Sequence, residues 1–117
     1  MSNKRQVSVR TTKKIFELLQ ICSAAGQEPV TTIISRLLET ELKNPPSVAG
    51  TVRIAERGET FEKRLSFYVE TSAWKSFSLQ CQLLRIKPAT RVNQLLLGYL
   101  KEHRDLWEDS DAIDETS

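Results

Sequence analysis

Histidine, cysteine and glycine are scarce in this chain, which has 117 residues with one histidine, two cysteines and four glycines. Cys22 and Cys81 lie 59 positions apart and outside any cluster with metal-ligand spacing, so we expect small buried apolar residues there. His103 falls late on a helical stripe, where a core or surface role is the default. No paired carboxylates, nucleophile with a base or glycine-rich phosphate loop is evident. The sequence therefore predicts no cofactor, no metal site and no enzyme.

Long hydrophobic runs are also lacking. No apolar run approaches the roughly eighteen residues that a bilayer-spanning helix needs, and the N-terminus lacks the apolar core of a signal peptide. We expect a soluble, cytoplasmic protein without a membrane partner. The length of 117 residues suits one domain or two small units that share a core, because isolated units of about 45 residues are marginally stable.

Charges of one sign are missing from each end of the chain. The last ten residues contain five acids and no base, so residues 1–107 carry 17 basic against 10 acidic residues although the formal net charge is only +2. The first fourteen residues contain no acid, and their bases are Lys4, Arg5, Arg10, Lys13 and Lys14. A basic body with an acidic tail favours a polyanion as partner, and a solvated charged surface is the plainer alternative.

Two short stretches, residues 4–12 and 63–69, alternate between apolar and polar side chains as β-strands do. The side expected to face a core carries Val7, Val9, Leu65, Phe67 and Val69. The opposite side carries six hydrogen-bonding side chains, which are Gln6, Ser8, Arg10, Arg64, Ser66 and Tyr68.

Each predicted strand is followed by two stretches of helical periodicity. In the first half, apolar residues recur from Ile15 to Ala25, with Gly26 as a left-handed stop, and from residue 33 to 42, before Asn44-Pro45-Pro46. In the second half, the stripes cover residues 74–84 and 92–100, separated by Lys87-Pro88. Trp74 and Phe77 are assigned to the core rather than to base stacking. The predicted helix caps are Thr11 or Thr12, Thr31 or Thr32, Thr71 or Ser72, and Thr90.

The two halves repeat at a displacement of 58 to 59 residues, at which residues 37–43 align with 95–101 and Cys22 with Cys81. We interpret the chain as a duplication. It comprises a first repeat at 1–43, a linker at 44–62, a second repeat at 63–107 and an acidic tail at 108–117 that is expected to be disordered. In the linker, residues 51–54 alternate, which predicts either a short strand or an ordered segment that packs Val52 and Ile54 on the body.

A lone strand leaves backbone groups unpaired on both edges, so we expect the two strands to pair with each other. The predicted fold is mainly α with a short two-stranded antiparallel β-ribbon, an intramolecular pseudo-dimer of order β-α-α-linker-β-α-α. Such a ribbon fits the major groove of DNA, where arginine matches guanine and glutamine matches adenine. We predict that the six outward side chains contact bases; an ordinary solvated strand face is the alternative.

Phosphate contacts are expected where the second helix of each unit starts beside the ribbon, because free amides and the positive dipole end attract anions. Such contacts set affinity and register. Each threonine among them is also explained as a helix cap. The predicted phosphate contacts are Lys4, Arg5, Lys13, Lys14, Thr31, Thr32, Lys63, Lys87, Thr90 and Arg91.

With strand, helix, turn and helix in this order, the sequence resembles the ribbon-helix-helix family typified by the Arc and MetJ repressors. Gln6, Ser8 and Arg10 match the Gln-Asn-Arg triplet of the Arc type in spacing, with serine in the middle. Gly26 followed by Thr31-Thr32 resembles the turn and phosphate-binding helix start of the family. The resemblance covers nearly all of residues 4–43 and 63–104, and the tandem arrangement is similar to that of TraY-type plasmid proteins.

The resemblance implies sequence-specific binding of double-stranded DNA by one chain, as a transcriptional repressor or a plasmid-maintenance factor in transfer or partition, associated with the nucleoid or a plasmid. Because the second strand differs from the first, the site should be non-palindromic. Further self-association on adjacent sites is left open, and no small-molecule substrate is expected. The alternative is an antitoxin-like protein-interaction module that uses the acidic C-terminal tail.

Overall fold

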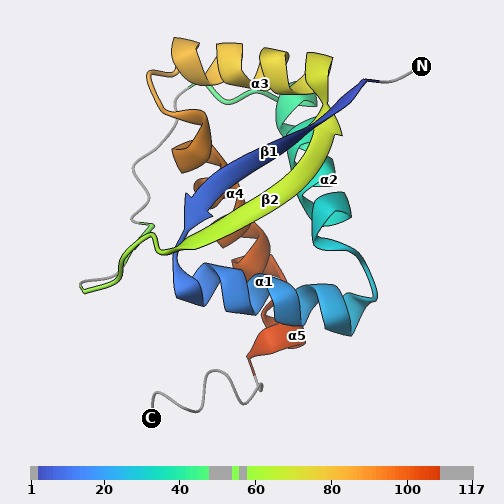
Figure 1. Cartoon of the computed structure of the whole chain (residues 1–117), viewed down its shortest axis with the longest axis vertical. Helices are drawn as coiled ribbons and strands as arrows, with labels where there is room; N and C mark the ends of the chain where they lie inside the picture. The colour runs from blue at the N-terminus through green and yellow to red at the C-terminus, as the bar shows by residue number, and fades with distance from the viewer. Residues whose placement is uncertain (1–2, 48–53, 56–57, 109–117) are drawn as a thin grey trace.

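The computed structural model describes residues 3–47, 54–55 and 58–108. These residues are mainly helical with one two-stranded antiparallel sheet, as the sequence predicted at this level (Figure 1). The elements in chain order are β1 (Lys4–Thr11), α1 (Lys13–Gly26), α2 (Val30–Lys43), β2 (Lys63–Glu70), α3 (Thr71–Leu83), α4 (Pro88–Glu102) and the short α5 (Arg104–Trp107).

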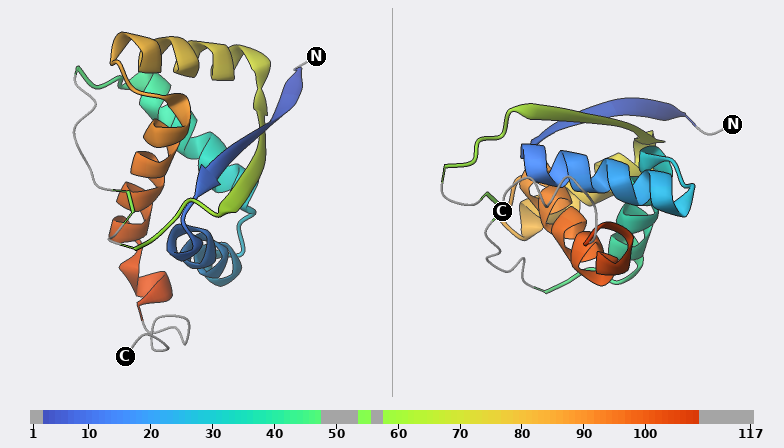
Figure 2. Two further views of the ribbon diagram at one scale, coloured as in Figure 1. Left: turned by 60° about the vertical axis from the view of Figure 1, so that its left-hand side comes forward. Right: turned by 90° about the horizontal axis from the view of Figure 1, so that it is seen from below.

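Among the described residues the sheet consists of β1 and β2, and both strands lie on one face of the helices (Figure 2). Val7 is the Cα partner of Phe67, and Val9 is the partner of Leu65. These side chains and that of Val69 are buried, while the residues between them are exposed. The alternation in the sequence therefore predicted the face that each residue occupies, and the unpaired edges of a lone strand predicted that the two segments pair.

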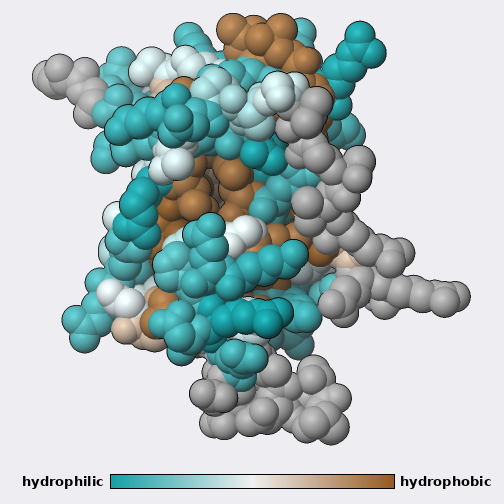
Figure 3. All heavy atoms as spheres, turned by 180° about the vertical axis from the view of Figure 1, so that it is seen from behind, coloured by the Kyte–Doolittle hydropathy of each residue, from teal (hydrophilic) through white to brown (hydrophobic). Residues whose placement is uncertain are grey.

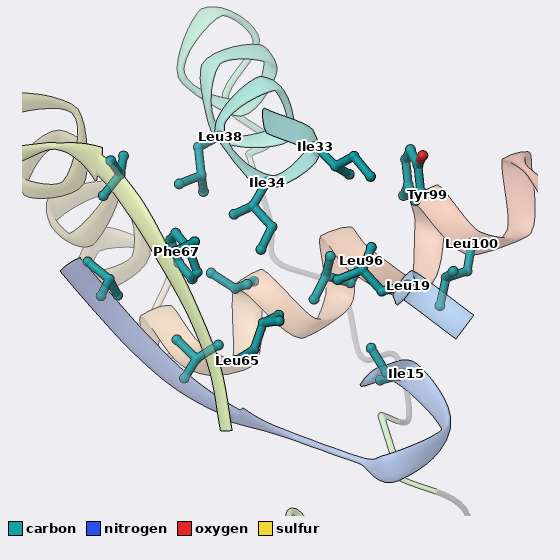
Figure 4. Close-up of a cluster of buried hydrophobic side chains, with 14 of the residues drawn as sticks. Ile15, Leu19, Ile33, Ile34, Leu38, Leu65, Phe67, Leu96, Tyr99 and Leu100 are labelled. Carbon is teal, nitrogen blue, oxygen red and sulfur yellow. The ribbon is translucent and has the colours of Figure 1, made fainter. Parts of the chain in front are cut away.

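The hydrophobic core lies between the ribbon and the helices. In Figure 4, Phe67 of β2 lies among side chains that include Ile34 of α2 and Leu96 of α4. Phe67 and Leu96 have no exposed surface, and burying one side chain of this size contributes about 1.5–3 kcal/mol relative to leaving it in water. From α1 the core takes Ile15, Leu18, Leu19 and Cys22, but Ala25 is exposed, so the predicted stripe ends one turn early.

The predicted helix caps are correct only for α1, where Thr12 Oγ1 accepts a hydrogen bond of 3.2 Å from the Ile15 amide. The other three helices with a predicted cap begin at or before the predicted residue and have no side-chain cap. In α4, Pro88 takes the first position, where its fixed φ and missing N–H suit a helix start, so Thr90 lies inside the first turn.

The same shift of the start occurs in α2 and α3, so the caps predicted at Thr31 or Thr32 and at Thr71 or Ser72 are wrong. Pro29 is the N-cap of α2, which places both threonines in its first turn. In α3, which follows β2 directly, the Thr71 amide donates a 2.8 Å hydrogen bond to the Asn3 carbonyl oxygen, so a backbone group satisfies this amide in place of a side-chain cap.

The first interhelical turn differs from the prediction by one residue. Gly26 belongs to α1, and the left-handed residue is Gln27, with φ of 52°. The Glu28 amide then donates to the Ser23 carbonyl oxygen at 3.0 Å. Arg85, with φ of 58°, takes the left-handed position after α3, and the Ile86 amide donates to the Cys81 carbonyl oxygen at 3.0 Å. The two turns thus have the same hydrogen-bond pattern.

Within the predicted linker, Ile54 packs against the core as expected, whereas Val52 and the alternating residues before Ile54 lie outside the described residues. The same holds for residues 109–117 of the acidic tail. The short helix α5 was not predicted; Trp107 Nε1 donates a 2.7 Å hydrogen bond to the Leu100 carbonyl oxygen and holds α5 against α4. Among the described helices, none has the length and apolar character that crossing a membrane requires.

Candidate nucleic-acid interface

The ribbon has one outward row of side chains, and the structure brings all six predicted base-contacting residues together in it. The Cα partners along this row are Lys4 with Glu70, Gln6 with Tyr68, Ser8 with Ser66, and Arg10 with Arg64. Every one of these residues is exposed, and Tyr68 retains 53% of its surface despite its aromatic ring. The row is therefore a polar surface, and its order follows from the register of the two strands, which run antiparallel side by side in Figure 1.

Small hydroxyls occupy the centre of the row. Ser8 Oγ lies 2.9 Å from Ser66 Oγ, so the two side chains hydrogen-bond to each other across the strands. The longer side chains of Arg10 and Arg64 stand opposite each other two positions further along. Like charges directly opposite in a sheet are destabilising, and neither arginine forms an ion pair with a carboxylate of the described residues. Within the part of the chain that the structure describes, their charges are therefore not paired with an acid.

The helices α2 and α4 hold the two strands from the sides through polar contacts to backbone oxygens. Ser35 Oγ of α2 donates to the Tyr68 carbonyl oxygen at 3.3 Å. Asn93 Nδ2 of α4 donates to the Arg10 carbonyl oxygen at 2.9 Å and to that of Ala89 at 3.0 Å. Each contact joins the first half of a helix to the backbone of a strand residue, and the side chain of that strand residue faces outward.

Asn93 is the more strongly held of these two residues, with 2% of its surface exposed. Its Oδ1 accepts a 2.6 Å hydrogen bond from Thr11 Oγ1, so one side chain joins the end of β1 to α4. Sequence reasoning missed Asn93 and Ser35. A polar residue between the apolar positions Val92 and Leu96 was the available signal for Asn93.

Most of the predicted phosphate-contacting residues lie on the surface near the ribbon or at a helix start. Thr31 and Thr90 are half-buried in the first turns of α2 and α4, which no side chain caps. The Lys63 ammonium lies 5.7 Å from the ring centroid of Phe16, so this side chain is partly engaged by an aromatic face. The exposed members of the set are Lys4, Arg5, Lys13, Lys14, Thr32 and Lys87.

Arg91 does not fit the role predicted for it. Its Nε and Nη2 atoms donate to the two carboxylate oxygens of Glu41 at 2.6 and 3.0 Å, and Nη1 donates to Gln94 Oε1 at 2.8 Å. The guanidinium is thus held by Glu41 of α2 and Gln94 of α4, so Arg91 is not a candidate phosphate contact. The partner is 50 residues away in sequence, which is why local spacing did not indicate it.

The surface on the opposite side of the molecule from the ribbon differs from it in having an apolar hollow (Figure 3). Figure 3, which views the molecule from behind, shows hydrophilic side chains around a hollow whose floor is hydrophobic. A cavity of about 560 Å³ lies between α2 and α4, with the Glu41–Arg91 pair and Tyr99 in its wall. The His103 ring stacks on Tyr99 with 4.1 Å between ring centroids, so the single histidine has a packing role.

Both cysteines are free and buried, as expected from their places on apolar stripes. Burial raises the pKa of the Cys81 thiol to about 11, and burial also raises the pKa of Cys22. In the part of the chain that the structure describes, no group of three or more His, Cys, Asp or Glu residues could hold a metal ion.

No family model, no curated protein and no solved structure matches this chain.

Proposed function

We propose that this protein binds double-stranded DNA sequence-specifically by inserting the β1–β2 ribbon into the major groove. The observation that carries the proposal is the exposed outward row, in which Gln6, Arg10 and Arg64 stand on one face of an isolated two-stranded ribbon. The major groove admits such a ribbon, and each base pair presents a distinct set of hydrogen-bonding groups there. Arginine can bind the two acceptors of guanine, and glutamine the donor and acceptor of adenine.

The spacing of the row supports this match. Outward residues recur about 6.6 Å apart along a strand, which is close to two base-pair rises of about 3.4 Å each. Gln6 and Arg10 are therefore separated by about four base-pair steps, so the part of the row between them spans about five base pairs. The side chains of Ser8 and Ser66 at the centre of the ribbon are short. They therefore leave room for the longer side chains on either side to reach base edges.

The tandem ribbon-helix-helix arrangement belongs to the same proposal, and matched contacts support it. Ser8 and Ser66 are 58 positions apart and pair with each other at the centre of the ribbon, as equivalent residues on a pseudo-twofold axis would. The helices α2 and α4 begin at Val30 and Pro88, which are separated by the same 58 positions.

The flanking hydrogen bonds repeat the relation. Ser35 binds the carbonyl oxygen of Tyr68, and Asn93 binds that of Arg10. Asn93 follows Ser35, and Tyr68 follows Arg10, by 58 positions in each case. Each second helix thus holds the strand of the other repeat, which is the exchange expected of a pseudo-dimer that folds as one unit.

Contacts with the DNA backbone would come from the flanks of the ribbon. The first turns of α2 and α4 have backbone amides that no side chain caps, and such amides bind phosphate oxygens well. The threonines in these turns and the exposed lysines near the ribbon would add contacts that set affinity without reading sequence.

Occupancy of a DNA site is the simplest way for such a protein to act. Bound at a promoter, the protein would block polymerase and act as a transcriptional repressor. Bound at a plasmid origin of transfer or a centromere-like site, it would help to assemble a transfer or partition complex. The position of the sites in the genome decides between these roles.

The proposal is tested by selecting DNA fragments that the full chain retains and measuring their affinity by mobility shift. We expect Arg10→Ala and Arg64→Ala each to weaken binding to a selected fragment about tenfold or more, because each substitution removes a bidentate base contact. Arg104→Ala on α5 removes the same charge from an exposed site outside the ribbon and should leave the affinity within about twofold. Unchanged affinity in both ribbon variants would contradict the assignment.

A further inference from the structure

The two ends of the outward row are chemically different. One end presents the cross-strand pair of Arg10 and Arg64, and the other presents Gln6 opposite Tyr68. We infer that the ribbon binds DNA in a single orientation, with the arginine end over base pairs that contain guanine and the Gln6–Tyr68 end over A·T pairs. This inference rests on the proposed function and specifies which DNA the same surface recognises.

The arginine end suits guanine because it presents two exposed guanidinium groups. Arg10 and Arg64 are both exposed, and neither forms an ion pair with an acid of the described residues. Lys63 of β2 follows at the next pairing position, and α1 begins with Lys13 just beyond. Two guanidinium groups side by side can each take the O6 and N7 acceptors of a guanine, whereas an A·T pair offers each of them only one acceptor beside a donor or a methyl group.

The other end is nearly neutral and suits A·T pairs. The Gln6 amide matches the N6 donor and N7 acceptor of adenine, and the exposed ring of Tyr68 provides apolar surface for a thymine methyl group. Beyond them Lys4 stands opposite Glu70, and Glu39 of α2 lines the same surface depression as Tyr68 and Glu70. These carboxylates lower the positive potential at this end. Contacts with base edges therefore contribute more to binding there than electrostatic attraction to the DNA backbone does.

The single orientation on DNA follows from the chemical difference between the two ends of the ribbon. A ribbon of two identical strands has two equivalent ends and reads a palindrome equally well either way round. Turning this ribbon by 180° would place both arginines over the A·T pairs and Gln6 with Tyr68 over the guanines. Because each lost bidentate contact costs about tenfold in affinity, the reversed complex would be at least about tenfold weaker.

Two measurements on the full chain test the inference. The first selects tight-binding sites from a pool of random double-stranded DNA. The second attaches an iron chelate that cleaves nearby DNA at a cysteine introduced by Glu17→Cys in α1 or by Ser76→Cys in α3. These positions lie one turn inside the helices that follow the arginine end and the Gln6–Tyr68 end, respectively. Cys22 and Cys81 are 1% exposed, so labelling is confined to the introduced thiol.

We expect a non-palindromic core with guanine about four base-pair steps from an A·T segment. The chelate at position 17 should cut only the guanine flank, and the chelate at position 76 only the A·T flank. A palindromic core, or equal cutting of both flanks by either variant, would overturn the single orientation while leaving the proposed function intact. Failure to enrich any sequence would overturn the proposed function itself.

A substitution adds an independent check of the base assignment. In Arg64→Gln, the selected core should lose guanine preference at one end only, and the A·T end should keep its sequence. A change of preference at the A·T end alone would show that the ends have been assigned in reverse.

Discussion

Arg91 of α4 and Glu41 of α2 form a bidentate ion pair, in which Nε of the arginine lies 2.6 Å from Oε2 of the glutamate and Nη2 lies 3.0 Å from Oε1. Their side chains are 13% and 8% exposed, so the pair is largely removed from water. Removing one partner of such a pair leaves an uncompensated buried charge, which typically costs about 3–5 kcal/mol. We expect Glu41→Ala to lower the free energy of unfolding in urea by about this amount.

The matched control replaces both partners, because apolar residues of similar volume often restore stability at a buried ion pair. The double variant Glu41→Leu with Arg91→Leu should therefore be more stable than Glu41→Ala by at least about 2 kcal/mol. Equal stability of the single and double variants would show that the charge itself matters little.

Asn93 and Ser35 provide a second comparison, because they make corresponding contacts with very different burial. Asn93→Ala would leave Thr11 Oγ1 and the Arg10 carbonyl oxygen without their present partner. Unsatisfied buried polar groups cost about 1–3 kcal/mol, so we expect a loss of that size in thermal or urea unfolding. Ser35→Ala removes a longer, exposed hydrogen bond and should change stability by less than about 0.5 kcal/mol. Similar losses in the two variants would contradict this ranking.

Trp74 separates core packing from base recognition. Its ring lies 6.1 Å from Phe67 and 5.5 Å from Phe77 between centroids, and it faces the core side of β2. Large-to-small substitution of an aromatic core residue costs about 3–5 kcal/mol, and we expect Trp74→Ala to lose about 3 kcal/mol because the side chain is only half-buried. The protein that remains folded should select the same DNA sequence as the wild type. An altered selected sequence would assign Trp74 to the interface.

Ionisation of the buried thiol of Cys81 makes the stability of the protein depend on pH. Burial raises the pKa of Cys81 from its usual 9.0 to about 11, so the native state favours the protonated thiol. This contribution to stability is fully present below pH 9 and is lost as the pH rises toward 11. At pH 8 we expect little alkylation of Cys22 and Cys81 by iodoacetamide in the native protein, and two alkylated thiols in denaturing urea, as measured by intact mass. Rapid double alkylation without denaturant would contradict the burial of the thiols.

The strand pairing could be predicted because a lone strand leaves backbone groups unpaired on both edges, and the alternation of period two fixes which residues face the core, since a one-residue slip would bury the polar set. Val7 and Val9 had to face a core, so Gln6, Ser8 and Arg10 had to face outward. The helical stripes were predicted for the same reason, from periods of three and four residues.

The starts of α2 and α4 were predicted wrongly although a local signal for them was present in the two prolines, and the ion pair could not be predicted from local sequence at all. At Pro29 and Pro88, the fixed φ of proline starts the helix before the threonines that resemble caps. Gly26 was expected in the left-handed region, but the α1 hydrogen bonds extend one residue further and Gln27 takes that conformation. Glu41 interrupts an apolar stripe, yet its partner comes from another helix and is visible only when α2 and α4 are packed together.

The two strands of the ribbon belong to one polypeptide, and this has a consequence for how the protein responds to its own concentration. A ribbon assembled from separate copies would come apart on dilution, since its stability depends on the amount of protein present. Here the strands meet in a unimolecular step, so the surface is complete at the lowest cellular abundance. If the ribbon binds DNA as proposed, each molecule is a whole binding unit, and occupancy of a single isolated site at low copy number rises in proportion to copy number rather than with its square.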